Sequence, residues 1–457
     1  MISPLFLRLR SVSLRRFAVS LVPALLFVAG LSPASAQIGG TNPTGPAGAF
    51  NGSITTGCNY DPATGNSARV ITDLSLPSVG AYPLAFTRYS NSRGYEPLNH
   101  HFGQPGNWWH SYTWYILPLL TANRNSLYPT SYEVQFPDGR DETFTSAGAR
   151  TTAGITDKII PLNNSTMLTY VVLPDGGKVE FMSVRTASGN GYLFMYQAQA
   201  LIDPYGNRTT FTNDPENLLQ VTEPGGKWIQ LFYSTQFGEI VLDHITASDG
   251  RTVQYTYQSI APSSQSYCAL TNVTYFGDNT IQAAYTYQAA NGGNPAGTPL
   301  LATCDDPMYA GPMKKISYTY ATSNADTSIP VAAGQIASEN SGTTGQVVSQ
   351  LVVPVATPSG SKRTENRGDG PSRSFTYNTS GLLTSFTDFN GVAATQGYDT
   401  NAFLNSYTDR KGNQTNLTND PGTGNILKIM YPIDPERYPD GNASRDCQLR
   451  LRLLDLP

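Results

Sequence analysis

Acidic residues that recur at a fixed place in a repeated phrase are the side chains with the clearest capacity for chemistry. Two carboxylates at a defined separation would suit glycoside hydrolysis, and a row of them would suit Ca²⁺, which prefers oxygen ligands. Each acid is followed three residues later by glycine, however, which is typical of turns where the acid bonds its own backbone and glycine takes positive φ. We therefore predict structural turns at four pairs: Asp203 with Gly206, Glu223 with Gly226, Asp388 with Gly391, and Asp409 with Gly412.

The histidines and the known catalytic motifs add little to this. His100, His101 and His110 lie close together in the sequence. Their spacing is unusual for a zinc site, and no cysteine or acid joins them, so we predict ordinary hydrogen-bonded loop histidines. The sequence has no phosphate-binding loop, no H-E-x-x-H, no G-x-S-x-G and no EF-hand pattern. We expect no catalytic residue, no metal and no cofactor.

Tryptophans are the candidate groups for binding sugars, because aromatic faces can stack on the apolar faces of sugar rings. Ordinary packing in the core is the favoured interpretation. Neighbouring side chains of a strand point to opposite faces, so we expect at most one of an adjacent pair to be exposed. The candidates are Trp108, Trp109, Trp114 and Trp228.

The cysteines do not form a metal-binding or redox motif. None of Cys58, Cys268, Cys304 and Cys447 belongs to a C-x-x-C pair. Export would permit disulfides, and Cys268 and Cys304 flank an irregular segment, so they are the candidate pair. Buried free thiols are the alternative.

The N-terminus predicts export. Basic residues precede an apolar run from Phe17 to Leu31, which ends in the small-residue sequence SPASAQ, and we expect cleavage after Ala36. A retained membrane anchor is the alternative, although roughly 20 apolar residues are usually needed to span a bilayer. Twin-arginine export is a weaker alternative, because the flanking residues fit its pattern poorly. The predicted location is the medium or the cell surface.

Composition favours strands and disfavours nucleic acid as a partner. The chain has 29 basic and 33 acidic residues, and the predicted signal removes four arginines, which leaves a net charge of −8. Proteins bind nucleic acid mainly by neutralising phosphates, so this balance is unfavourable. Charged residues make up only 14% of the chain, while 27 Tyr and 42 Gly are present. That composition is typical of strands and turns.

A phrase of 21 residues, with strands of about seven residues each, repeats along the chain. TYNTSGLLTSFTDFNGVAATQ, from Thr376, is followed by GYDTNAFLNSYTDRKGNQT at an offset of 21 residues, and weaker copies lie upstream. Alternating side chains predict strands, and the acid and glycine predict the reversal between them. One hairpin is marginal alone, so neighbours must pair edge to edge. The equivalent positions are Tyr377 and Tyr398, Gly381 and Ala402, Leu383 and Leu404, Phe386 and Tyr407, Asp388 and Asp409, and Gly391 and Gly412.

These phrases resemble the YD repeat of bacterial Rhs proteins, which also occurs in toxin-complex shells and teneurins. The segments VITDLSLPSVGAYPLAFTRYSNSR, HFGQPGNWWHSYTWYI and YEVQFPDGRDETF are similar to the domain that precedes those repeats. The resemblance covers roughly residues 66 to 436. It implies a spiral of antiparallel hairpins forming a hollow β-cage around a C-terminal toxin, and carbohydrate binding has been proposed for such repeats.

The chain departs from that pattern at its C-terminal end. It has no self-cleaving core signature and no toxin domain, and it ends in YPDGNASRDCQLRLRLLDLP. We expect this tail to be a frameshift or truncation product, with a partial shell as the result.

We predict an all-β protein in which an antiparallel YD-repeat hairpin spiral, a partial β-cage, follows a small β domain. The expected segments are a signal peptide (1–36), a flexible leader (37–66), the N-terminal β domain (67–148), degenerate repeats (149–320), a polar insertion with one hairpin (321–371), clear repeats (372–436) and an aberrant tail (437–457).

The leading functional hypothesis is an exported, non-enzymatic β-shell scaffold or surface interaction protein. A carbohydrate-binding envelope adhesin is the alternative, and a hydrolase is a third. The expected partners are a polysaccharide or cell-surface molecule, with an enclosed toxin polypeptide only in longer relatives.

Overall fold

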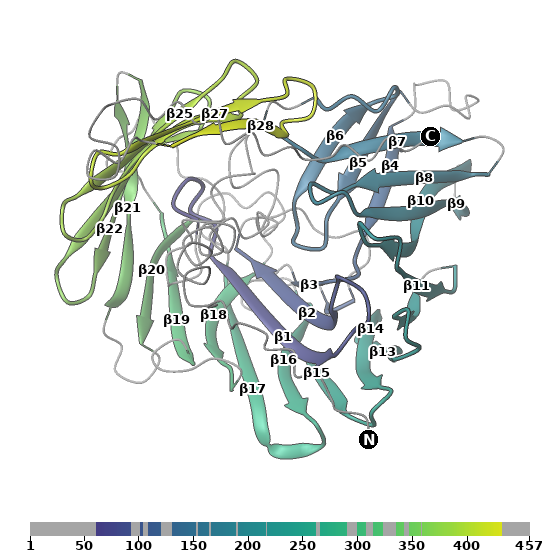
Figure 1. Cartoon of the computed structure of the whole chain (residues 1–457). Helices are drawn as coiled ribbons and strands as arrows, with labels where there is room; N and C mark the ends of the chain where they lie inside the picture. The colour runs from purple at the N-terminus through teal and green to yellow at the C-terminus, as the bar shows by residue number, and fades with distance from the viewer. Residues whose placement is uncertain are drawn as a thin grey trace, which may run out of the picture.

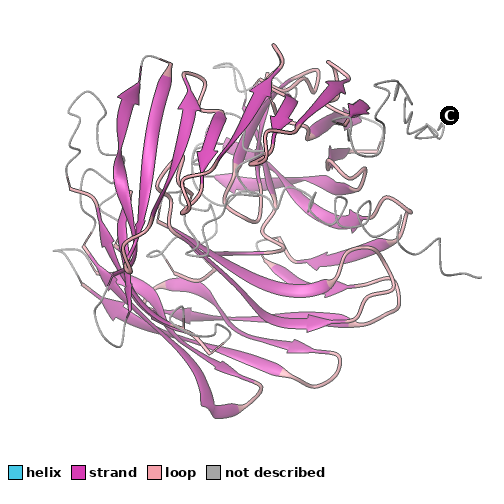
Figure 2. Cartoon of the chain, turned by 60° about the vertical axis from the view of Figure 1, so that its left-hand side comes forward, coloured by secondary structure: helices cyan, strands magenta, loops and turns pink. Residues whose placement is uncertain are grey.

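The part of the chain that the structure, a computed structural model, describes contains only strands and their connections (Figures 1 and 2). It describes residues 61–431 apart from 93–100, 104–107, 120–129, 152–153, 164–165, 189–190, 216, 262–265, 290–298, 308–313, 323–334, 342–346 and 358. The predicted signal peptide, most of the leader and the predicted tail lie outside these ranges. Within them, no helix is long and apolar enough to cross a membrane.

Strands β1 (Ala68–Leu76), β2 (Leu84–Asn91) and β3 (Trp108–His110) form a separate antiparallel sheet, which we call the inner sheet. A bulge between Thr72 and Leu74 interrupts the pairing of β1 with β2. In Figure 1 this purple sheet lies inside the curve made by the other strands.

All remaining strands belong to a large sheet, which we call the wall. Its first strands are β4 (Tyr115–Leu119), β5 (Ser131–Gln135), β6 (Asp141–Thr145), β7 (Lys158–Asn163), β8 (Leu168–Val172), β9 (Lys178–Ser188), β10 (Gly191–Ile202), β11 (Arg208–Asn213) and β12 (Leu218–Thr222). The middle strands are β13 (Trp228–Gln236), β14 (Glu239–Ala247), β15 (Thr252–Ile260), β16 (Tyr267–Tyr275), β17 (Asp278–Gln288), β18 (Leu300–Asp305), β19 (Lys315–Tyr320) and β20 (Ile336–Ser341). The last are β21 (Val347–Thr357), β22 (Gly360–Arg367), β23 (Ser372–Asn378), β24 (Leu383–Thr387), β25 (Ala393–Tyr398), β26 (Leu404–Thr408), β27 (Gln414–Asn419) and β28 (Ile426–Met430).

Each wall strand from β7 to β28 pairs antiparallel with the next in chain order. Strands β4 to β6 join this ladder where Ile116 pairs with Tyr196 of β10. The wall curls until its last strands lie beside its first (Figure 1). There the Arg150 guanidinium donates to the Pro421 carbonyl at 3.2 Å and stacks over Phe403.

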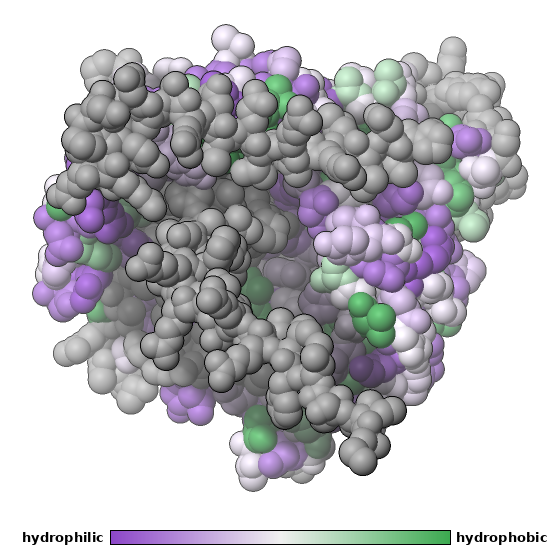
Figure 3. Space-filling view, viewed as in Figure 1, coloured by the Kyte–Doolittle hydropathy of each residue, from purple (hydrophilic) through white to green (hydrophobic). Residues whose placement is uncertain are grey.

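One hydrophobic core joins the inner sheet to most of the wall. It contains Ile71 and Phe86 of the inner sheet together with side chains from β4 to β20, such as Val253 and Ile336. Alternation places these residues on the concave face of the wall, because successive side chains point to opposite faces. On the face shown in Figure 3, the exposed apolar residues are scattered among hydrophilic ones.

The predicted all-β class with a long antiparallel hairpin series is confirmed. The predicted N-terminal β domain contributes to both sheets, since β1 to β3 are internal and β4 to β6 belong to the wall. The stretch predicted as a polar insertion with one hairpin supplies β20, β21 and β22, which continue the wall without a break.

Candidate functional site

The four repeat acids lie at hairpin turns of the wall. An oxygen of each aspartate accepts the main-chain N–H groups two and four residues later, and the Glu223 carboxylate accepts the Lys227 N–H at 3.1 Å. These distances are 2.9 and 2.8 Å at Asp203, 2.9 and 3.0 Å at Asp388, and 2.8 and 2.8 Å at Asp409. The paired glycines all have positive φ: Gly206 (88°), Gly226 (91°), Gly391 (79°) and Gly412 (85°).

These hydrogen bonds keep the acids ionised. Burial raises the pKa of Glu223, but N–H groups of Gly225, Val79 and Lys227 outweigh it and lower the pKa to about 2. The N–H of Val392 lowers the pKa of Asp388, and the amide of Asn413 lowers that of Asp409. A carboxylate saturated by its own turn is a poor general acid, so these residues do not resemble a catalytic pair.

Two of the acids also hold the connection between β1 and β2 against the edge of the wall. The second oxygen of Glu223 accepts the Val79 N–H at 3.0 Å, and that of Asp203 accepts the Ala81 N–H at 2.8 Å. Val79 and Ala81 are two residues apart, so one short, bent segment of backbone contacts two hairpin turns on the same edge of the wall.

Neighbouring turns extend this contact on both sides. The Tyr82 hydroxyl donates to Asp175 at 2.6 Å, in the turn before β9. Lys227 and Arg251, in the turns before β13 and β15, donate to the carbonyls of Pro77 and Ser75 at 2.8 and 2.7 Å. We call these contacts between residues 75–82 and the four wall turns before β9, β11, β13 and β15 the rim clamp.

A second attachment lies in the centre of the core, where Asp73 of β1 and Arg88 of β2 form an ion pair with no exposed side-chain surface. The guanidinium contacts the carboxylate at 2.5 and 2.9 Å, and it donates to the hydroxyls of Tyr275 and Tyr285 at 3.2 Å each. Tyr255 and Tyr275 donate back to Asp73 at 2.8 and 3.0 Å. We call this group the buried lock.

The buried lock joins the inner sheet to three wall strands. Tyr255, Tyr275 and Tyr285 belong to β15, β16 and β17, and Tyr285 also donates to Asp306 at 2.6 Å. Burial alone would lower the pKa of Arg88, but Asp73 reverses this and raises it well above its usual value. These hydrogen bonds engage Nε and one terminal nitrogen of the guanidinium, while its Nη1 is buried without a partner. A buried charge pair needs such partners, because removing ions from water is costly.

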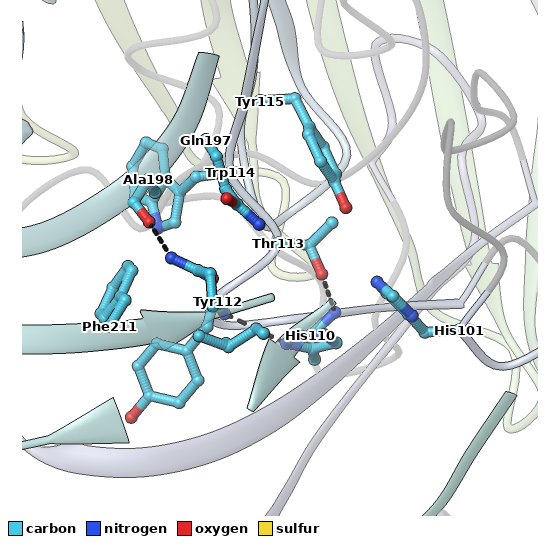
Figure 4. A pocket seen from close by; sticks show the side chains of 11 residues that line it. His101, His110, Tyr112, Thr113, Trp114, Tyr115, Gln197, Ala198 and Phe211 are labelled. Atoms are coloured by element: carbon cyan, nitrogen blue, oxygen red, sulfur yellow. Dashed lines mark hydrogen bonds between the residues drawn. The ribbon is translucent and has the colours of Figure 1, made fainter. Parts of the chain in front are cut away.

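Two of the histidines lie beside a small cavity between the inner sheet and the wall (Figure 4). Its volume of about 20 Å³ is about that of one water molecule. Burial lowers the pKa of His110, whose ring stacks on Phe86 at 4.9 Å. The rings of His101 and His110 are 5.7 Å apart, and the described residues contain no metal-binding cluster. His100 lies outside the described residues.

The possible sugar-stacking role of Trp108 and Trp109 is contradicted, because both side chains pack in the core, at 2% and 1% exposure. The Trp108 indole donates to the Tyr287 hydroxyl at 3.1 Å, and its ring packs against Arg88. Trp114 is partly buried against Phe136 and lines the cavity of Figure 4, and Trp228 is partly buried in β13.

The predicted disulfide between Cys268 and Cys304 is also wrong. Both are free buried thiols. Cys268 lies in β16 and Cys304 in β18, with β17 paired between them. Two strand spacings amount to about 9.6 Å, beyond the roughly 7 Å limit for bridged Cα atoms. Burial raises the pKa of each thiol to about 11, so both stay protonated at neutral pH.

Sequence reasoning missed the residues that hold the inner sheet in place. A usable signal existed, because Asp73 and Arg88 interrupt the apolar strand phrases VITDLSL and LAFTRYS. A charge within a strand that faces a core must find a partner. The partners themselves could not be foreseen, since Asp73 and Tyr275 are 202 residues apart.

No family model and no curated protein matches this chain. Solved structures give distant matches. A TcdB2-TccC3-TEV chain is 12% identical over 76% of this chain and 16% of its own, with a TM-score of 0.28. The Photorhabdus luminescens Tc holotoxin pore is 11% identical over 80% and 21%, with a TM-score of 0.26. A porin-like protein from Bacteroides uniformis is 10% identical over 64% and 92%, with a TM-score of 0.20.

This chain spans less than a quarter of either toxin-complex chain. TM-scores this low carry no argument about fold or function.

Proposed function

We propose that this chain is an exported, non-enzymatic scaffold of the Rhs/YD-repeat kind, whose wall forms a β-shell around its own inner sheet. The observation that carries the proposal is the unbroken ladder of hairpins from β7 to β28, fastened to the inner sheet by the rim clamp and the buried lock. Repeats that pair only with their neighbours build extended surfaces, which suits a structural or interaction role.

The use of the charged residues supports a role without catalysis. The repeat acids are engaged by their own turns, and the strongly perturbed groups Arg88 and His110 are enclosed in the core. An active site instead places its perturbed groups in an accessible cleft. The pockets found among the described residues do not bring such a set together.

The inner sheet changes what the shell is expected to contain. The inner sheet fills the concave side of the wall from β4 to β20, and its side chains complete the core there. In this part of the shell the chain therefore encloses its own N-terminal strands, and we propose no toxin cargo. Nothing favours an adhesin built on tryptophan platforms, since Trp108 and Trp109 are buried.

Limited proteolysis with surface labelling tests the proposal. We expect purified protein to yield a large resistant fragment that retains both the inner sheet and the wall. We also expect protease added to intact producing cells to reach the protein, or the medium to contain it. A ladder of small fragments would contradict a cooperative shell, and protein confined to the cytosol would contradict export.

A further inference from the structure

The wall lacks a described second layer on the concave face of its last strands. The main core ends at β20, and a small separate cluster of Phe375, Tyr377 and Leu383 follows it. Beyond that cluster, strands β25 to β28 continue the same face, on which Ala394 is buried and five larger side chains are only partly buried. These are Tyr398, Leu404, Tyr407, Leu417 and Ile429.

The register shows that these residues share one face. Phe375 pairs with Phe386, and Phe386 pairs with Ala394. Directly paired residues lie on the same side of a sheet, and residues two apart in a strand do as well. On the following strands, Tyr398 pairs with Leu404, Tyr407 pairs with Thr415, and Leu417 pairs with Ile429. We call this surface the bare face.

The opposite side of these strands is mostly polar, with the exposed Met430 as an apolar exception. It carries Thr395, Ser406, Thr408, Asn416 and Thr418. Such a two-sided pattern is typical of a sheet with one face in water and the other against a second layer. At the Tyr398 end of the bare face there is also a pocket of about 300 Å³, lined in part by Leu382 and Gln396. There is room for side chains of another segment.

The first described residues enter the shell next to this surface. Ala63 packs against the cluster of Phe375, Tyr377 and Leu383, which adjoins the bare face. The Tyr398 hydroxyl donates to the Leu383 carbonyl at 2.7 Å, which shows how close the two surfaces are. Asp61 and Asn66 close a turn, with the Asp61 N–H donating to the Asn66 carbonyl at 2.8 Å. The described chain therefore begins beside this surface.

The sequence of those residues fits an apolar partner. In FNGSITTGCNY, from Phe50 to Tyr60, the larger apolar residues Phe50, Ile54, Cys58 and Tyr60 all fall on even positions, and the odd positions are polar or glycine. Alternation of this kind is typical of a strand with one buried face. Fully extended, residues 50–60 would be about 33 Å long, whereas the four strands β25 to β28 together are roughly 14 Å wide.

We propose that residues 50–60 bind the bare face as an extended segment, with Ile54, Cys58 and Tyr60 directed toward Tyr398, Tyr407 and Leu417. The N-terminal leader thereby supplies the missing layer of the shell and is a structural part of it. A second copy of the chain and an unrelated polypeptide are the competing occupants.

Cross-linking from Cys58 tests this directly. In a Cys447→Ser background, Leu417→Cys places a thiol on the bare face, and Thr418→Cys places one on the opposite side of the same strand. Cys268 and Cys304 are buried and do not compete for the reagent. With a short bismaleimide, we expect Cys58 to join Leu417→Cys within one chain, at a yield at least about tenfold above Thr418→Cys, because proximity raises effective concentration.

Other results would overturn the proposal. Equal yields from Leu417→Cys and Thr418→Cys, or no cross-link to either, would show that the leader does not lie on this face. A cross-link between chains would assign the face to a second copy. Should Leu417→Cys fail to fold, as judged by circular dichroism, the pair Tyr407→Cys and Thr408→Cys gives the same comparison on β26.

Discussion

At the scale of single residues, the molecule depends on charges that are satisfied away from water. In the buried lock, the guanidinium of Arg88 contacts Asp73 and two tyrosine hydroxyls, and none of the ion pair's side-chain surface is exposed. Removing one member leaves the other charge buried without its counterion, which is much more costly than removing both.

Replacement of Arg88 by methionine should therefore destabilise the whole fold. We expect Arg88→Met to lower the free energy of unfolding by about 3–5 kcal/mol, measured by urea denaturation. The double variant Asp73→Leu, Arg88→Met should recover part of that loss. Tyr275→Phe, which removes one hydroxyl that is hydrogen-bonded to both charges, should cost about 1.5–3 kcal/mol. A double variant as unstable as Arg88→Met would contradict the view that the unpaired charge is the cause.

A second buried group makes stability depend on pH. Burial raises the pKa of Asp138 to about 6, although the positive charge of Arg140 opposes the shift. The carboxylates of Asp157 and Glu142 also interact with the Arg140 guanidinium. The pKa of Asp138 is higher in the folded state than in the unfolded chain, so the folded state holds a proton that the unfolded chain releases. That contribution is fully present below about pH 4 and is lost as the pH rises through about 6.

We expect the free energy of unfolding to fall between about pH 4 and pH 7, with Asp138 contributing up to about 3 kcal/mol. Asp138→Asn should reduce this slope in urea titrations at a series of pH values, because the amide does not ionise. The rest of the slope is expected from Asp141, whose pKa burial raises to about 7. The turn acids act in the opposite sense below about pH 4, since the pKa values of Asp203 and Glu223 are lowered. An unchanged slope in Asp138→Asn would assign the effect to another group.

At the scale of the hairpin, two equivalent turns differ in whether glycine or alanine occupies the left-handed position. Asn378 and Asp399 each accept the N–H groups two and four residues later, so their turns have the same geometry. The first turn has Gly381 at φ 77°, whereas the second has Ala402 at φ 65°. An L-residue with a Cβ atom is strained in this region by roughly 1–2 kcal/mol.

The two turns therefore predict opposite effects of the same exchange. Ala402→Gly should raise the free energy of unfolding by up to about 1 kcal/mol, because relief of strain exceeds the entropy that glycine loses on folding. Gly381→Ala should lower it by a similar amount. Chemical denaturation of both variants checks this. A loss of stability in Ala402→Gly would mean that the turn tolerates alanine without strain.

At the scale of the whole molecule, the shell has a strongly and a weakly supported part. The wall up to β20 shares one core with the inner sheet, while strands β23 to β28 have only the small cluster around Phe375 among the described residues. Local opening is easiest where few apolar contacts are buried. The last hairpins should therefore open without disturbing the first part.

Hydrogen exchange should separate these two parts. We expect amides of β25 to β28 to exchange at opening free energies several kcal/mol below those of β13 to β16, whose side chains meet the inner sheet. Mass spectrometry of peptides from native protein measures this. Equal protection in both regions would show that the shell opens only as one unit.

The repeated phrase by itself determined the hairpin, its antiparallel class and the place of its turns. A turn acid and its N–H partners lie within four residues, so short-range sequence contains the whole interaction. Tertiary structure alone decided what fills the shell, why Trp108 is buried and why Cys268 cannot reach Cys304. Those outcomes depend on strands that meet after the wall has curled, as when Asp73 contacts Tyr255 across 182 residues. No local pattern specifies such a meeting, because any amphipathic strand could have supplied the second layer.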